Sequence, residues 1–115
     1  MTTVYELVAS ALTSLSPIPC VAGRYVPASA AAPLPDVFVV YTMVSSSAAQ
    51  HADGTEKHRN YRMQLAIYSR TGLTSLPDVD TLMTAAGWMR SSEREIGYDR
   101  DTGHYGLIKD YVILI

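Results

Sequence analysis

The segment from Arg59 to Ser69 constrains the fold most, because its apolar residues alternate with polar or mixed ones. A strand directs successive side chains to opposite faces, so every second residue shares a face. One predicted face is apolar and consists of Tyr61, Met63, Leu65 and Ile67. The other is mixed and consists of Arg62, Gln64, Ala66 and Tyr68. The pattern predicts a strand with one face on the core and the other partly wet or covered by another subunit.

The composition favours one soluble domain. A chain of 115 residues with 48% hydrophobic and 17% charged residues can bury one core and is not of disordered type. The net charge of −2 argues against a specific nucleic-acid partner, because such proteins usually present a basic surface. No secretory signal pattern is evident, and no stretch approaches the roughly 20 apolar residues that cross a bilayer. We therefore expect no membrane partner.

The first helix is predicted from about Thr3 to Ser14. Its apolar residues follow helical spacing and are Val4, Leu7, Val8, Ala11, Leu12 and Leu15. Thr2 or Thr3 can cap its start, and Pro17 and Pro19 end it because proline cannot continue the hydrogen-bond ladder. Cys20, the single cysteine, excludes an intrachain disulfide framework and is expected to be a small buried hydrophobe.

The middle of the chain predicts two strands before the alternating one. A short strand is expected around Arg24-Tyr25-Val26, followed by a proline-containing loop over residues 28–36. Val37 to Val44 is apolar on both faces and predicts a central strand that is covered on both sides. The polar stretch from Ser45 to Lys57 predicts a long mobile connection between the strands of an extended hairpin.

The second half of the chain predicts a helix and a closing hairpin. Ser75 is the expected N-cap, and Gly87 is the expected left-handed residue at the other end, with Trp88 folding back on Met83. Strands are expected over residues 90–99 and 105–115, joined by a turn at Asp101-Thr102-Gly103. The whole predicts an α+β domain in the order α-β-β-β-α-β-β. Its mainly antiparallel sheet has four to five strands, and both helices pack on one face.

No motif in the chain favours an enzyme. Asp101-Thr102-Gly103 spells the triplet of aspartic proteases, but its flanks are polar and predict a solvated turn. His51, Asp53, Glu56 and His58 lie close together in a polar stretch that lacks a metal-binding pattern. Asp99, Asp101 and Gly103 lack the closing glutamate of a calcium loop. We therefore expect no catalytic, cofactor-binding or metal-binding residues.

The ordered set of segments resembles the tail completion, or tail terminator, proteins of long-tailed bacteriophages and prophages. The resemblance rests on an N-terminal amphipathic helix before Val37-Phe38-Val39-Val40-Tyr41 and on a polar loop before the strand that starts at Tyr61. It also rests on a helix that ends at Ala86-Gly87-Trp88 and on the run from Tyr98 to Tyr105 before a closing strand. It covers most of the chain.

The resemblance implies a structural virion protein of the tail, assembled in the cytoplasm of the host bacterium. Such proteins form a homo-oligomeric ring, commonly hexameric, that caps the major tail tube protein and presents a surface to the head connector or stopper protein. In this chain the expected contacts with other copies and partners lie at Gln50, His51, Asp53, Glu56, Lys57, Arg59, Arg62 and Tyr68. Two alternatives remain open: a neck or head-closure protein, and a small monomeric ligand-binding domain or hydrolase.

Overall fold

The computed structural model describes residues 3–26, 34–52 and 55–115, and their elements follow the predicted order. Most of the predicted 28–36 loop lies outside these residues. The elements are α1 (Val4–Ala11), the 3-10 turn η1 (Thr13–Leu15), β1 (Cys20–Ala22), β2 (Val37–Ala52), β3 (Thr55–Ser69), α2 (Val79–Ala85), β4 (Met89–Asp99) and β5 (His104–Leu114).

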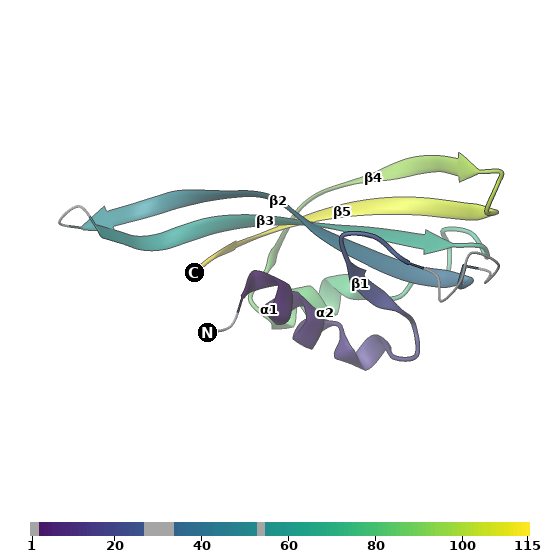
Figure 1. Ribbon diagram of the computed structural model, residues 1–115, viewed down its shortest axis with the longest axis horizontal. Helices are drawn as coiled ribbons and strands as arrows, with labels where there is room; N and C mark the ends of the chain where they lie inside the picture. The colour runs from purple at the N-terminus through teal and green to yellow at the C-terminus, as the bar shows by residue number, and fades with distance from the viewer. Residues whose placement is uncertain (1–2, 27–33, 53–54) are drawn as a thin grey trace.

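The strands form one five-stranded sheet in the order β1-β2-β3-β5-β4. The β1–β2 pair is parallel, and the other neighbouring pairs are antiparallel. Both helices lie on the same side of this sheet (Figure 1). The predicted α+β class, strand count and placement of the helices are confirmed.

The core lies between the helices and the face of β3 that the alternation predicted. Met63, Leu65 and Ile67 are fully buried, and Tyr61 is half-buried against them. The other buried core members are Val8, Leu12, Val39, Tyr41, Val79, Met83, Trp88 and Tyr111. Burial of this apolar surface holds both helices on the sheet.

The first helix begins as predicted and ends earlier. The hydroxyl of Thr3 accepts a hydrogen bond from the Glu6 amide at 3.2 Å, which makes Thr3 the N-cap. The α-helix ends at Ala11, and the chain continues through η1 before Pro17. The predicted helix to Ser14 is therefore an α-helix followed by a tighter 3-10 turn.

The second helix starts later than predicted and ends as predicted. Asp78, and not Ser75, is the N-cap, because its side chain accepts from the Thr81 amide at 3.2 Å. The residue before Pro77 is disfavoured in a helix, so the helix cannot begin at Ser75. Gly87 has a φ of 98°, and the Trp88 amide donates to the Met83 carbonyl at 3.0 Å. This is the predicted Schellman ending.

The short first strand lies earlier than predicted, at Cys20–Ala22 instead of around Arg24-Tyr25-Val26. Gly23 follows it with a φ of 79° and donates its amide to the Tyr41 carbonyl at 3.0 Å. This glycine turns the chain away from β2, so no pairing with β2 continues past it.

The second strand was predicted as central and covered along its length, and this is correct only in part. Phe38, Val39 and Tyr41 are buried, but Met43 and Val44 are 36% and 52% exposed. β2 lies second from one side of the sheet, and β3 is the middle strand. β1 pairs with β2 only from Val39 to Tyr41, so past Tyr41 β2 has a strand neighbour on one edge alone among the described residues.

The prediction of a long loop from Ser45 to Lys57 is wrong. β2 runs to Ala52 and β3 starts at Thr55, and the two strands stay paired to that end. We call residues 46–52 of β2 and 55–58 of β3 the arm; it projects beyond the rest of the molecule (Figure 1). The molecule measures 54 × 28 × 23 Å. Serine and alanine are weak signals for a strand, and cross-strand pairing decided the outcome here.

Candidate assembly surface

The arm is a two-stranded ribbon with little support from the sheet. β5 pairs with β3 only as far as the backbone hydrogen bonds of 2.8 and 3.0 Å between Arg59 and Ile115. β1 ends its pairing with β2 at Tyr41. Two-stranded ribbons are marginal in water, and open strand edges are normally covered or protected. The arm is therefore the part of the fold that gains most from contact with another surface.

Register shifts bend the arm at its base and near its middle. They lie between Met43 and Ser45, between Ala48 and Gln50, and between Gln50 and His51. Bulges of this kind increase the local right-handed twist of a strand pair. The arm therefore leaves the sheet with its own twist.

The predicted contact residues divide between the arm, its root and the far end of the sheet. Gln50, His51, Glu56 and Lys57 lie in the strands of the arm, with Gln50 opposite His58 and His51 opposite Glu56. Asp53 lies outside the described residues. Arg59 and Arg62 lie at the root of the arm, with Arg59 opposite Ala48 and Arg62 opposite Ser45.

Both root arginines make contacts within the chain. Arg59 donates from Nη1 to Ser46 Oγ at 3.0 Å. Arg62 donates from Nη1 to Ser91 Oγ at 3.0 Å and lies 3.5 Å from an Asp110 carboxylate oxygen. These contacts orient the two side chains at the base of the arm.

Tyr68 does not belong to the same surface. At the rise of a strand, Tyr68 lies about 30 Å along β3 from Arg59. Its ring stacks on Phe38, with the ring centroids 4.9 Å apart, on the sheet face opposite the helices. The predicted contact set therefore does not form one patch.

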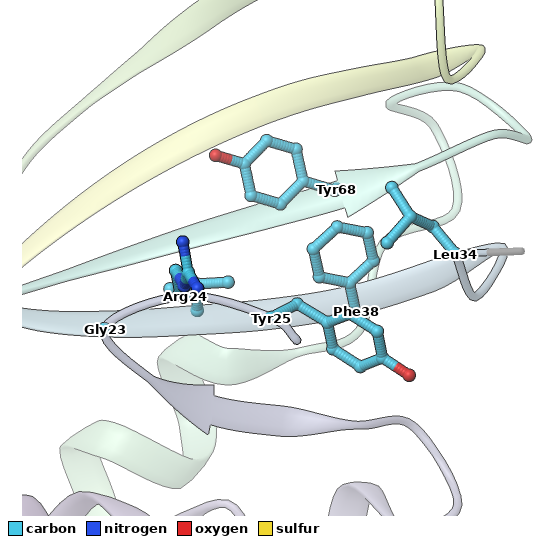
Figure 2. Close-up of a pocket in the computed structure, with 7 residues that line it drawn as sticks. Gly23, Arg24, Tyr25, Leu34, Phe38 and Tyr68 are labelled. Atoms are coloured by element: carbon cyan, nitrogen blue, oxygen red, sulfur yellow. The ribbon is translucent and has the colours of Figure 1, made fainter. Parts of the chain in front are cut away.

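An aromatic groove surrounds Tyr68 at that far end. Its volume is about 230 Å³, and its lining includes Tyr25, Phe38, Tyr68 and Leu34, with Arg24 at one side (Figure 2). His104 packs edge-on against Phe38, with ring centroids 5.2 Å apart. Sequence reasoning missed this groove because it depends on the pairing of Phe38 with Tyr68 across the β2–β3 ladder.

A larger, apolar groove lies on the helix side at the root of the arm. Its volume is about 640 Å³, and it is lined by Thr3, Val4, Tyr5, Leu7, Met43, Tyr61 and Ile115. Tyr5 Oη accepts a hydrogen bond from the Met43 amide at 3.2 Å, and Thr3 caps α1, so these hydroxyls serve the chain itself. The sequence offered one sign of this groove, the apolar residue Met43 in β2. It was not recognised because the apolar run that contains Met43 was predicted to be covered on both faces.

A charge cluster holds α2 to the sheet. The Asp80 carboxylate accepts hydrogen bonds from Tyr111 Oη, from Lys109 Nζ at 3.0 Å and from Arg90 Nη1 at 3.1 Å. Burial acts to raise the pKa of Asp80, but the hydrogen bonds from Tyr111 and Lys109 and the nearby cations lower it overall. Burial, and then the bond to Asp80, raise the pKa of Tyr111. The ionised carboxylate of Asp80 therefore links α2 to β4 and β5.

The triplet Asp101-Thr102-Gly103 forms the predicted turn between β4 and β5. The Asp101 side chain is exposed, and its amide donates to Asp99 Oδ1 at 2.9 Å. Gly103 has a φ of 77°, which the turn requires. Across the described residues, no group of three or more His, Cys, Asp or Glu side chains is placed to hold a metal ion.

Cys20 was predicted to be a small buried hydrophobe; it packs against the core at the start of β1 but is only half-buried. Burial raises the pKa of its thiol, which keeps the sulfur protonated. Neither α1 nor α2, the α-helices of the described residues, has the length and apolarity needed to span a membrane.

Comparison of the sequence with protein-family models and with curated proteins gives no match in either set.

Proposed function

We propose that this chain is a structural subunit of the virion tail of a long-tailed bacteriophage or prophage. In this role copies of the chain form a ring that caps the tail tube, ends its polymerisation and provides the surface that joins tail to head. The observation that supports the proposal most is the arm, a ribbon that projects from the sheet with little support from its own chain. A ring subunit places such a ribbon against a neighbour, which covers its open edges.

Apolar side chains around the root of the arm support the same role. Met43, Val44, Leu114 and Ile115 are 36%, 52%, 57% and 49% exposed, and Met89 nearby is 68% exposed. Protein–protein interfaces place apolar and methionine side chains at their centre and polar groups at their rim. The polar arm beside an apolar root matches that arrangement.

Light scattering of the purified protein, at several concentrations and with tail-tube protein added, tests the proposal. We expect a closed oligomer, commonly of six copies in this family, either in the free protein or on the end of the tube. Electron microscopy then shows tubes that are capped and stop growing. A protein that stays monomeric at every concentration and never binds tube protein contradicts the proposal.

A parallel measurement separates a tail terminator from a neck or head-closure protein. The same protein is mixed with connector protein in place of tube protein. Binding to the tube, with or without the connector, supports the terminator role. Binding to the connector alone favours the neck protein.

The apolar groove favours one alternative from another class. Its volume of about 640 Å³ falls within the range of small-ligand sites. An apolar fluorescent probe tests this alternative in the purified protein. Stoichiometric binding to a strict monomer, lost in the variant Met43→Lys, favours a ligand-binding domain; displacement of the probe on oligomerisation favours the ring.

A further inference from the structure

The described sheet has two incompletely paired sides. On one side it ends with β4, whose outer edge has no strand neighbour among the described residues. On the other side β1 covers β2 only from Val39 to Tyr41. Beyond Tyr41 the Met43 amide is bound by Tyr5 Oη, and β2 then continues to Ala52 without an outer strand in the described part of the chain.

The two sides differ in the charge of their residues. Residues 45–52 of β2 are serine, alanine, glutamine and histidine, with no lysine, arginine, aspartate, glutamate or proline. β4 carries Arg90, Glu93, Arg94 and Glu95, all exposed. Charged residues and prolines are the usual protection of a free edge, so the β2 edge has little protection against strand addition. The bulges of β2 bend this edge but place no charged residue on it.

The charges of β4 oppose pairing of β4 with itself. In a two-fold antiparallel pair, residues of the same face lie opposite each other across the axis. A register centred on Glu93, Arg94 or Glu95 places that residue opposite its own copy. Centring on Ser92 places Arg90 opposite Arg94, and centring on Ile96 places Glu93 opposite Asp99. Like charges directly opposite are destabilising, and these five registers are the ones that pair most of β4 with its own copy. β4 therefore favours a different edge as its partner.

Strand direction makes β2 of a second copy suitable. β2 and β5 run one way, and β3 and β4 run the other. A ring axis that follows the strands keeps this direction from copy to copy. β4 of one copy then meets β2 of the next in the antiparallel sense, and the contact is heterologous, as a closed ring requires.

The level of the strands sets the offset between copies. Within one chain, Ser45 aligns with Met89 through Arg62 and Val112, so the arm extends past the level at which β4 begins. The next copy must therefore be displaced along the strands. A stagger of this kind is what closure of a tilted sheet requires.

We infer that β4 of one copy adds to the outer edge of residues 45–52 of β2 in the next copy, so that the sheet continues from subunit to subunit. The inference rests on the proposed function, because it names the contact that builds the ring.

Chemical cross-linking tests the contact in the full-length chain. In a Cys20→Ser background, one variant carries Ser47→Cys on β2 and a second carries Glu95→Cys on β4; both side chains are exposed. The two are mixed and treated with a short bismaleimide. We expect a product of twice the chain mass in the mixture that neither variant gives alone. A single chain with both substitutions is expected to give a ladder that ends at the ring.

The control replaces Glu95→Cys by Thr84→Cys, an exposed position on α2, and is expected to give no product. Rings by light scattering without the mixed product overturn this inference and leave the proposed function standing. A product from Ser47→Cys alone also overturns it, because two β2 edges then pair with each other. If the protein forms no rings, binds no tube protein and gives no cross-linked product, both proposals fail. Circular dichroism of each variant verifies the fold.

Discussion

Arg70 joins three segments at the end of the sheet that lies away from the arm. Its Nε donates to the Thr102 carbonyl at 2.9 Å, and its Nη1 donates to the Leu34 carbonyl at 2.9 Å and to Asp36 Oδ1 at 3.1 Å. The guanidinium therefore links the start of β2 to the β4–β5 turn. A planar fork with several donors is suited to this geometry, and a lysine ammonium is not.

Replacing Arg70 by alanine is expected to destabilise the fold by about 1–3 kcal/mol, because two backbone carbonyls lose a charged donor. Urea unfolding followed by circular dichroism measures the change. Arg100→Ala, at an exposed position of the same turn, is the matched control and is expected to change stability by less than about 0.5 kcal/mol. Equal effects of the two variants contradict the role of Arg70.

Asp80 gives the fold a predictable acid response. Burial opposes its ionisation, but Tyr111, Lys109 and Arg90 lower the pKa overall in the folded state. A lowered folded pKa contributes stability that is present above the unfolded pKa of about 3.9 and is lost as the pH falls through the folded value. We therefore expect the urea concentration at the midpoint of unfolding to decrease as the pH is lowered below about 4, in part because Asp80 becomes protonated.

The variant Asp80→Asn isolates that contribution. It is expected to lower stability at pH 7 by roughly 1–3 kcal/mol and to flatten the dependence of stability on pH below about pH 4. Glu95→Gln, at an exposed position on β4, is the control. It is expected to show the same loss of stability below about pH 4 as the full chain. If Asp80→Asn loses stability below about pH 4 as steeply as the full chain does, other carboxylates are responsible for that loss.

At the level of single elements, the ending of α2 depends on Gly87. Its φ of 98° is strained for any residue with a Cβ, although an added Cβ would meet only Ile113 Cδ1 at 3.5 Å. Gly87→Ala is therefore expected to cost about 1–2 kcal/mol through backbone strain and not through a clash. Thermal unfolding measures this loss. Gly97→Ala, where the glycine is not left-handed and nothing lies within 4 Å, is expected to be much milder.

The elements that the sequence predicted well are those with local signals. The alternation of Tyr61, Met63, Leu65 and Ile67 and the Gly87-Trp88 ending need only neighbours in the chain. The predicted start of α2 was wrong because Ser75 and Asp78 both carry a side-chain oxygen that can cap a helix. The hydrogen bond from the Thr81 amide to Asp78 decides between them. The prediction of a loop for the arm residues was wrong because the two strands of the arm are stabilised by pairing with each other, which their composition does not reveal.

At the scale of the whole molecule, the arm and the core are separable. The buried core side chains that the structure describes all lie outside residues 46–58. Ala48 lies opposite Arg59 in the β2–β3 ladder, so a variant that joins these two residues through an Asn-Gly turn and lacks residues 49–58 keeps the register. It is therefore expected to fold with a stability within about 1 kcal/mol of the full chain. The same variant is expected to lose ring formation and tube binding in light scattering. Rings that persist without the arm would contradict its proposed role.

The overall architecture could be predicted, and the candidate surface only in part. The order of elements and the helix layer follow from periodicity and from prolines and glycines such as Pro17, Gly23 and Gly87, which follow η1, β1 and α2. The grooves at Tyr5 and at Phe38 bring together residues from distant parts of the chain. Their positions depend on strand register, which composition and spacing do not contain.

The arm also has a mechanical consequence. Its strands are continuous with β2 and β3, whose ladder extends from Ala52 and Thr55 to Val37 and Ser69. A pull on the outer end of both strands is carried straight into the middle of the sheet. Antiparallel hydrogen bonds lie across the strands, so drawing one strand past its neighbours loads many of them together. A subunit gripped by its arm would therefore resist tension along that axis better than a force that peels the sheet open.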